Sequence, residues 1–469
     1  MRALFPAVAL ALVLAGVAPA ADEIRVPPIT RTTLDNGVRL VLAEYHELPL
    51  VEVTVIVGAG AAQDPPDRDG LAALTAGALM KGAGKRSAEE LARAIESLGG
   101  RIDANPGTDG TIVSAEFLAK DVAAGLALLR DVLLEPRFAR DEIRRTREEQ
   151  EANIVSSLED GSAVAEKCYA ALLYGAHPYG RPVEGRRATV ADLGRGDVTD
   201  FYERWYRPNN TIVAFVGDLT KGQALAHLKD TFGGWRGRPD AVPPRAAPPA
   251  PIGARRVLLV DKPDATQTQI RFGNVAIARN DPRWIPAVVA NTILGGGFTS
   301  RLVEELRVKR SLTYSAWSTF AARLMGGDFR VGTFTKGPTT VETLRLALDV
   351  EGDFRSRPPP AAALEKAKTY LAGQFPLKIE SPDALAARLA EIEFHGLSPD
   401  ELATYRTRVA AVTGADVAAT AAALMPDPTA VAVVVVGKAS EIREPLTAAF
   451  GPLETIAPAD CERLSARVK

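Results

Sequence analysis

A proline-rich segment near the middle of the chain constrains the fold most, because it separates two stretches with the same order of predicted elements. Residues 237–253 (GRPDAVPPRAAPPAPIG) combine prolines with alanine and arginine, a composition typical of an extended, semi-rigid linker. On either side, short strand patterns alternate with helical patterns, so we expect two domains, residues 30–236 and 254–469. The sequence therefore predicts an α+β protein made of two similar halves.

In the first half, turn residues and apolar periodicity define the expected elements. Asn36-Gly37 is a hairpin signal between two strands, and Ser87 with Glu90 forms a capping box at the start of a helix. The expected strands lie at 33–42 on either side of that turn and at 51–57, 101–104, 111–117 and 211–218. The expected helices lie at 71–79, 87–98, 122–134, 141–158 and 162–174.

The second half repeats this order with little sequence identity to the first. The helix expected at 285–294 takes the position of the helix at 71–79. The expected strands are 256–260, 267–274, 314–321, 328–335 and 429–437, and the expected helices are 285–294, 340–354, 360–379 and one late helix before the last strand.

The amino terminus has the pattern of a secretory signal peptide over residues 1–21. Arg2 gives a positive start, residues 7–17 are apolar, and Ala18-Pro19-Ala20 is a cleavage site of small residues. The apolar run is too short for a membrane span, and no other candidate span follows. We expect an exported, soluble protein, periplasmic if the cell has two membranes.

Composition and charge exclude some classes of partner. The chain has 469 residues, is 46% hydrophobic and 24% charged, and carries 56 basic against 58 acidic residues, a formal net charge of -2. This is an ordinary globular composition that gives no electrostatic case for binding nucleic acid or an anionic membrane.

The two cysteines, Cys168 and Cys461, lie far apart in the sequence. A disulfide between them is open in an oxidising compartment, but no sequence signal supports it. We expect two isolated thiols, with Cys168 on the buried face of a helix.

The segment from Leu34 to Gly82 resembles the start of the pitrilysin-type (M16) zinc peptidases, which include the mitochondrial processing peptidases. In that family the helix that corresponds to 70–82 carries an inverted zinc motif, H-x-x-E-H. In this chain the two His positions are Ala73 and Gly77, and the Glu position is Ala76. Alanine and glycine have no side-chain atom that can bind a metal. The sequence around the motif is therefore kept, but its metal-binding residues are not.

The third zinc ligand of the family is a Glu on a second helix, and the corresponding residue here is Asn153. Glu149 or Glu151 could supply a carboxylate if the alignment shifted, but one carboxylate without two imidazoles makes a poor zinc site. The resemblance therefore implies that this chain binds no zinc or other cofactor.

Two further stretches of the first half match the family. The block Tyr174 to Pro182 (YGAHPYGRP) resembles a family loop outside the zinc set, so we expect a structural role for His177 rather than a role as ligand or base. The segment Tyr206 to Asp218 also matches, and in the family its strand closes the first sheet.

The second half carries two further family features. A triple glycine, Gly295-Gly296-Gly297, permits close backbone approach and is expected to bind substrate. Arg307 and Tyr314 coincide with the Arg/Tyr pair that the family places beside the catalytic zinc, where both groups donate hydrogen bonds to the developing oxyanion. Without the resemblance, Arg307 would read as a solvated charge and Tyr314 as the start of a strand.

The resemblance implies two α/β-roll repeats of the mitochondrial processing peptidase type, each a mostly antiparallel sheet backed by helices, around a central cavity. It also implies a metal-free subunit of a periplasmic heterodimeric peptidase, inactive alone. This subunit would line a chamber for unfolded peptides and donate Arg307 and Tyr314 to the zinc site of an H-x-x-E-H partner. The alternative is a non-enzymatic scaffold or peptide-binding protein. A peptidase that uses other ligands alone is disfavoured, because the four histidines are scattered.

Overall fold

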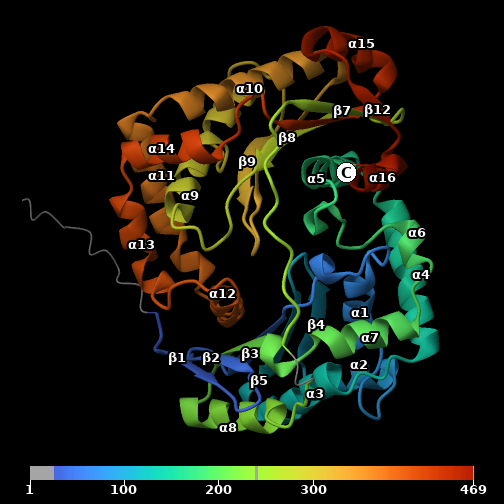
Figure 1. Cartoon of the computed structure of the whole chain (residues 1–469). Coiled ribbons are helices and arrows are strands. Elements are labelled where there is room, and N and C mark those ends of the chain that lie inside the picture. Colours follow the sequence, from blue (N-terminus) through green and yellow to red (C-terminus); the bar gives the residue numbers. More distant parts are fainter. Residues whose placement is uncertain (1–25, 238–240, 468–469) are drawn as a thin grey trace, which may run out of the picture.

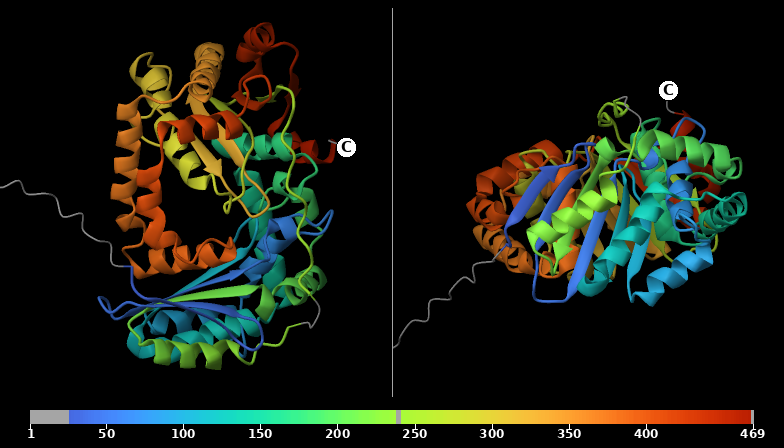
Figure 2. Two further views of the ribbon diagram at one scale, coloured as in Figure 1. Left: turned by 60° about the vertical axis from the view of Figure 1, so that its left-hand side comes forward. Right: turned by 90° about the horizontal axis from the view of Figure 1, so that it is seen from below.

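Two six-stranded sheets, each with its own layer of helices, form the two halves of the molecule (Figure 1). The structure is a computed structural model and describes residues 26–237 and 241–467, so the expected signal peptide lies outside the described residues. The first sheet has the strand order β1-β2-β6-β3-β5-β4 and the second has the order β12-β7-β11-β8-β10-β9. In the left view of Figure 2, most of the second half, coloured yellow to red, lies above the sheet of the first half, coloured blue to green.

The helices and strands have the following bounds. The strands of the first half are β1 (Ile29–Thr33), β2 (Arg39–Glu44), β3 (Leu50–Val57), β4 (Arg101–Pro106), β5 (Thr111–Leu118) and β6 (Thr211–Gly217). Its helices are α1 (Leu71–Leu79), α2 (Ala88–Ser97), α3 (Val122–Leu134), α4 (Arg140–Ser156), α5 (Gly161–Tyr174), α6 (Arg187–Val190), α7 (Arg195–Trp205) and α8 (Lys221–Phe232). The strands of the second half are β7 (Arg256–Asp261), β8 (Thr268–Val275), β9 (Ala316–Ala321), β10 (Asp328–Thr335), β11 (Ala432–Gly437) and β12 (Glu454–Ile456). Its helices are α9 (Trp284–Leu294), α10 (Thr340–Ser356), α11 (Ala361–Gln374), α12 (Pro382–Phe394), α13 (Glu401–Ala411), α14 (Gly414–Leu424), α15 (Ala439–Phe450) and α16 (Cys461–Arg467).

The two sheets confirm the predicted α+β fold of two similar, mostly antiparallel repeats. In both, the inner strands pair in the same pattern, with one parallel pair, β2 with β6 and β7 with β11. The edges differ. β1 precedes β2 in the chain and pairs with it antiparallel, whereas β12 comes from the end of the chain and pairs parallel with β7.

Local signals in the sequence account for many element boundaries. Gly37 adopts a positive φ of 96° in the turn between β1 and β2, a conformation that favours glycine. The Ser87 side chain accepts the Glu90 N–H, and the Glu90 carboxylate accepts the Ser87 N–H at 2.8 Å, which confirms the capping box of α2. The second half differs from the prediction. Three helices, α12 to α14, stand where one late helix was expected, and α15, β12 and α16 follow the last predicted strand.

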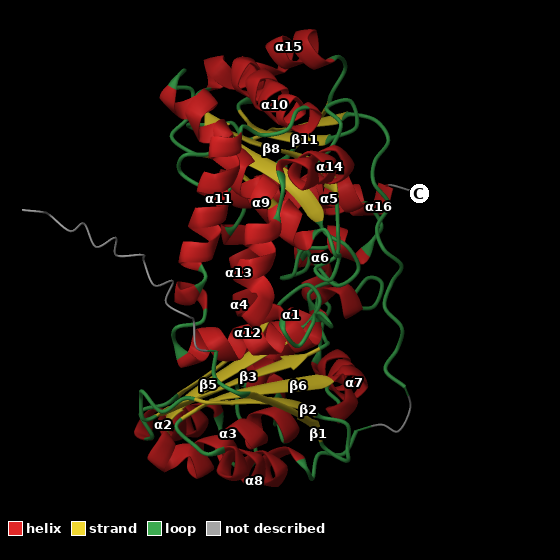
Figure 3. Ribbon diagram, turned by 90° about the vertical axis from the view of Figure 1, so that its left-hand side faces the viewer, coloured by secondary structure: helices red, strands yellow, loops and turns green. Residues whose placement is uncertain are grey.

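Each half contributes one helix to the sheet of the other. Apolar side chains of α5 (Val164, Cys168 and Leu172) share a buried cluster with Val434 and Val436 of β11 in the second sheet. Conversely, Leu385 and Leu389 of α12 pack with Ala214 and Val216 of β6 in the first sheet. Figure 3 shows α12 lying across the strands of the first sheet. The two halves are therefore joined by a shared core as well as by the linker.

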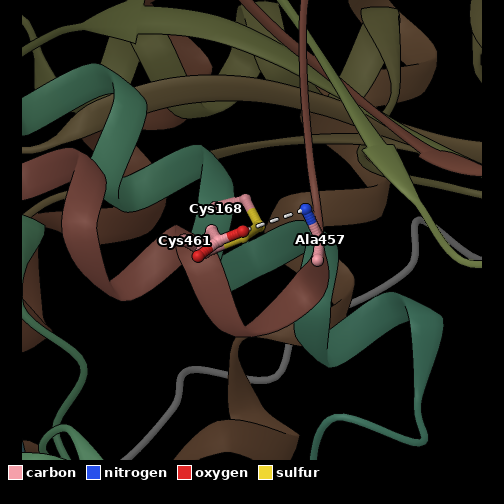
Figure 4. The surroundings of a disulfide bond; sticks show 4 residues. Cys168, Ala457 and Cys461 are labelled. Carbon is pink, nitrogen blue, oxygen red and sulfur yellow. Dashed lines mark hydrogen bonds between the residues drawn. A yellow bond between two sulfur atoms is a disulfide. The ribbon is translucent and has the colours of Figure 1, made fainter.

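Cys168 and Cys461 form a disulfide, which corrects the expectation of two isolated thiols (Figure 4). Their Cα atoms lie 4.9 Å apart, and 293 positions of sequence separate them. Cys168 does lie on the buried face of a helix, α5, as predicted. The pairing depends on α16, a helix that the sequence pattern did not reveal, packing beside α5.

None of the helices in the described part of the chain combines the length and the apolar character that a bilayer crossing needs.

Candidate functional site

The helix that corresponds to the family's zinc helix is α1, and it packs closely on α4. Ala76 is fully buried, while Ala73 and Gly77 are half-buried on one face. A Cβ atom on Gly77 would lie 3.0 Å from Thr146 Cγ2 of α4, so this face has little space for a larger side chain. α1 is held through backbone and packing contacts, and its three degenerate positions offer no ligand atom.

The facing residues of α4 do not restore a metal site. Gln150 turns toward the start of α1, where its Nε2 donates to the Gly70 carbonyl at 3.0 Å. Asn153 is exposed, and the exposed Glu149 pairs with Lys81 at 3.5 Å. Within residues 26–237 and 241–467, no three His, Cys, Asp or Glu side chains converge so that they could hold a metal ion. The residues at the family's zinc position do not fit zinc. Whether the purified chain carries metal stays a prediction.

The loop before α1 is fixed by buried ion pairs. Asp64 accepts the N–H groups of Gly70 and Ala72 at 2.7 and 2.8 Å, and Asp69 pairs with Arg181 and Arg186. This network orders the start of a helix that has no zinc ligands.

His177 has a structural place in the YGAHPYGRP block. Its Nδ1 accepts the Tyr179 N–H at 3.1 Å, and its Nε2 donates to the Ala247 carbonyl of the linker at 2.9 Å. Burial lowers the pKa of His177, which favours the neutral imidazole that this donor and acceptor pattern requires. His177 thus ties the proline-rich linker to the first half.

Arg307 and Tyr314, which the family resemblance singled out, lie in direct contact. The guanidinium carbon of Arg307 is 4.6 Å from the centroid of the Tyr314 ring, a cation–π contact. A π-helical turn (Val303–Val308) carries Arg307, and Ser311, with φ of 53°, reverses the chain so that Tyr314 returns beside it. Tyr314 is 74% exposed. In the described chain, neither the Arg307 guanidinium nor the Tyr314 hydroxyl has a hydrogen-bond or ion-pair partner.

Two apolar side chains near this pair in the sequence are also exposed to solvent. Phe298 is 87% exposed and Val308 is 61% exposed. We use the name exposed cluster for the exposed residues Phe298, Val308 and Tyr314 together with Arg307, a set grouped by closeness in the sequence. Exposed large apolar side chains beside unpaired donors are typical of surfaces that contact another molecule.

The triple glycine follows α9 and has one clear packing reason. The Gly295 carbonyl accepts the Ser318 N–H of β9 at 3.2 Å, and a Cβ atom at Gly295 would lie 2.4 Å from that nitrogen. Gly296 also has backbone close by, whereas a Cβ at Gly297 would meet nothing within 4 Å. Gly295 and Gly296 therefore both have packing reasons to be glycine, and a role of Gly295, Gly296 and Gly297 in binding substrate stays a prediction.

A cavity of about 900 Å³ lies between the two halves, lined by β3, the β4–β5 and β9–β10 loops, α9 and α12. Neither the degenerate residues of α1 nor the Arg307–Tyr314 pair lines it. Sequence analysis did not identify its residues, because they come from seven or more segments far apart in the chain. The aromatic and charged side chains of its wall are Arg279, Trp284, Phe320, Arg323, Phe375, Lys378, Arg388, Glu391, Phe394, His395 and Tyr405, with Asp109 at one end.

The chain is similar to family M16 peptidases along most of its length. Residues 39–187 match the family described as "Insulinase (Peptidase family M16)", and residues 192–371 match the "Peptidase M16 inactive domain". An uncharacterized zinc protease of Mycobacterium tuberculosis is 30% identical over 368 residues, which cover 78% of this chain and 83% of the relative. A non-peptidase homolog of Helicobacter pylori is 23% identical over 354 residues, covering 73% and 79%.

Solved structures give the same result. The crystal structure of a peptidase M16 inactive domain from Pseudomonas fluorescens superposes with a TM-score of 0.83 at 25% identity, covering 87% of this chain and 98% of that one. A protease from Helicobacter pylori superposes with a TM-score of 0.81 at 19% identity, covering 88% and 100%. By its fold and by these relatives, the chain belongs to peptidase family M16.

Proposed function

We propose that this chain is the metal-free subunit of a periplasmic heterodimeric M16 peptidase. In this assembly Arg307 and Tyr314 complete the zinc site of an H-x-x-E-H partner. The observation that carries the proposal is the Arg307–Tyr314 contact, in which both groups keep their hydrogen-bond donors free and Tyr314 is largely exposed. Because neither group bonds to another described residue, both donors remain available to a group that a partner subunit brings.

The chemistry of the pair fits transition-state stabilisation. Arg307 offers a permanent charge with a planar set of donors, and Tyr314 offers one hydroxyl donor. The partner's zinc would activate the attacking water. In the developing tetrahedral intermediate, the guanidinium and the phenol would donate to the same oxyanion. The cation–π contact holds the two groups in register before substrate arrives, so little reorganisation is needed.

The exposure of Phe298 and Val308, which lie near the pair in the sequence, supports contact with a second subunit. Both are exposed here and would lose water contact when a partner covers the exposed cluster. The Cys168–Cys461 disulfide supports the periplasmic location, because such bonds persist in oxidising compartments.

The alternative is a non-enzymatic scaffold or peptide-binding protein of the same fold. The relative whose name marks it as a non-peptidase homolog supports this reading, and so does the central cavity, which needs no zinc in order to bind a ligand.

Co-expression with an H-x-x-E-H family member from the same genome tests the proposal. A quenched fluorescent unfolded peptide should be cleaved by the purified complex and by neither chain alone. Failure of the chains to associate, or a partner that is equally active alone, would favour the scaffold reading.

A further inference from the structure

The central cavity contains cationic side chains that the protein does not neutralise. Four cationic side chains and two carboxylates line it. Arg279 and Arg388 are compensated, since they pair with Glu391 at 3.1 and 2.6 Å. The other two cations, Arg323 and Lys378, have no ion pair among the described residues.

Arg323 is held in place by rings rather than by an acid. Its guanidinium carbon lies 4.7 Å from the Tyr179 ring centroid and 5.4 Å from that of Tyr174. Its Nη1 is buried and has no hydrogen-bond partner in the described chain. The nearby Asp109 is already engaged, because its two oxygens accept the Tyr179 hydroxyl at 2.7 Å and the Leu324 N–H at 3.0 Å. Arg323 is therefore an oriented cation that forms no ion pair with another described residue.

A second residue of the cavity wall also has a buried polar atom without a partner. The Nδ1 atom of His395, at the end of α12, is buried without a partner among the residues that the structure describes. Buried polar atoms of this kind are rare in folded proteins unless a ligand or water completes them.

Most of the remaining wall is apolar. Trp284, Phe320, Phe375 and Phe394 line the cavity together with Ile56 and Ile112 of the first sheet. A volume of about 900 Å³ is within the range of ligand sites, which are commonly apolar with a few oriented polar groups. Such a wall suits apolar side chains, and the free guanidinium suits an anion at one end.

We infer that the central cavity binds the carboxylate of an apolar peptide, with Arg323 as its principal donor and Lys378 as a second cation. A carboxylate matches the planar donor set of a guanidinium and can accept two parallel hydrogen bonds. The carboxylate belongs either to the carboxyl terminus of the peptide or to an acidic side chain. The inference shares only the peptide ligand with the proposed function, and it requires neither a partner subunit nor zinc.

The experiment uses the purified full chain alone, titrated calorimetrically at pH 7.5 with three probes. These are the N-acetylated peptide Ala-Ala-Leu-Phe as free acid, the same peptide as carboxyl-terminal amide, and an amide in which the second Ala is replaced by Glu. We expect the free acid to bind about tenfold or more tightly than the amide, since a charge-assisted hydrogen bond contributes about one factor of ten or more. If the Glu-containing amide binds as tightly as the acid, the subsite accepts side-chain carboxylates as well. If the Glu-containing amide binds as weakly as the amide without Glu, the subsite recognises the carboxyl terminus of the peptide. Equal binding of all three peptides, or no binding, would overturn the inference.

Variants then locate the subsite. R323Q should lower the acid-to-amide ratio to about threefold or less, the share that Lys378 retains, while R443Q, which replaces an exposed arginine on α15, should leave the ratio unchanged. Trp284 fluorescence should respond to the acid, and W284F should remove that response. If R323Q loses the native melting transition, it cannot serve as the test. K378Q, at an exposed position, must then lower the acid-to-amide binding ratio about threefold. An unchanged ratio in the folded variant would overturn the assignment. If a reconstituted complex fails to cleave peptides, that result contradicts the proposed function. It does not change the peptide binding measured with the chain alone.

Discussion

Cys168 of α5 and Cys461 of α16 are joined covalently, although one belongs to the first half of the chain and the other lies near its end. α5, a helix of the first half, packs on the second sheet. The disulfide therefore ties this helix to the segment of the chain that forms the edge strand of that sheet, β12. The bond closes a loop that contains the linker and nearly all of the second half.

Removing this bond should lower the free energy of unfolding. We expect Cys168→Ser with Cys461→Ser to cost about 2–5 kcal/mol, mainly because the unfolded chain gains freedom. Urea unfolding of protein purified from an oxidising compartment measures the change. A reductant should move the wild-type midpoint to that of the double variant and leave the variant unaffected. Two titratable thiols in the native protein purified from that compartment would contradict the bond.

Local patterns were sufficient to predict most strands and helices of both halves. The Asn36-Gly37 turn and the capping box at Ser87 are encoded in a few neighbouring residues, so they can be recognised without tertiary structure. The exchange of helices cannot be recognised in this way. The apolar stripe of α5, with Val164, Cys168 and Leu172, predicts burial, but it does not tell which sheet covers it.

The residues of the candidate site also fall into those that the sequence indicates and those that only the structure reveals. Arg307 and Tyr314 were found through the family resemblance. The π-helical turn and the positive φ of Ser311 that bring them together leave no simple sequence signal. Arg323 and His395 were missed, because the cavity they share is assembled from hairpin loops and helices of both halves. That these two side chains have unpaired polar atoms can be recognised only from the positions of all their neighbours in the folded protein.

Restoring the zinc motif should recover metal binding more readily than peptidase activity. The variant with Ala73→His, Ala76→Glu, Gly77→His and Asn153→Glu supplies the ligands without the hydrogen bonds that orient them. A larger side chain at Gly77 also meets Thr146, so we expect a loss of about 1–3 kcal/mol in stability. Elemental analysis and thermal melting measure the two effects.

Thr146→Ala in the same background should regain part of that stability, because it removes the methyl group nearest to residue 77. The unmodified chain should contain no stoichiometric zinc. A quadruple variant that is fully active alone would mean that the rest of the pocket is intact, contrary to our expectation.

Glu351 of α10 should make stability fall as the pH rises from about 4.5 to about 8. It is fully buried, neither oxygen has a hydrogen-bond partner in the described chain, and burial raises its pKa to about 8. Because the folded-state pKa lies above the ordinary 4.5, the stabilisation is fully present below pH 4.5 and is lost as the pH rises through 8. Between pH 5 and pH 8.5, wild-type stability should fall by roughly 1–4 kcal/mol more than that of Glu351→Gln.

Urea unfolding at several pH values measures this difference. Glu342→Gln, at an exposed position of the same helix, should follow the wild-type pH dependence. Glu52 adds a slope of the same sign, since burial and the facing Glu116 raise its pKa to about 9, so the Glu351 variant should retain part of the decline. Parallel curves for wild type and Glu351→Gln would show that this carboxyl is charged or hydrated in the native protein.

The Arg307–Tyr314 pair gives the sharpest test of the proposed assembly. Tyr314→Phe removes one hydroxyl and keeps the ring on which Arg307 packs, whereas Arg307→Ala removes the charged donors. Losing one oxyanion donor costs roughly a hundred- to a thousandfold in kcat. We expect either change to reduce kcat of the reconstituted complex by that factor, with association of the subunits little altered.

Two control variants test whether the loss of kcat depends on which tyrosine and which arginine are replaced. Tyr370→Phe, at a tyrosine that is 43% exposed on α11, and Arg443→Ala, on α15, should leave kcat unchanged. The double variant at 307 and 314 should lose less than the sum of the two single losses in activation free energy, because both groups would act on one oxygen. Additive losses would place the two groups on separate atoms. Unaltered turnover in both single variants would show that this subunit donates no catalytic group, and the scaffold reading would then explain the exposed cluster as a docking surface alone.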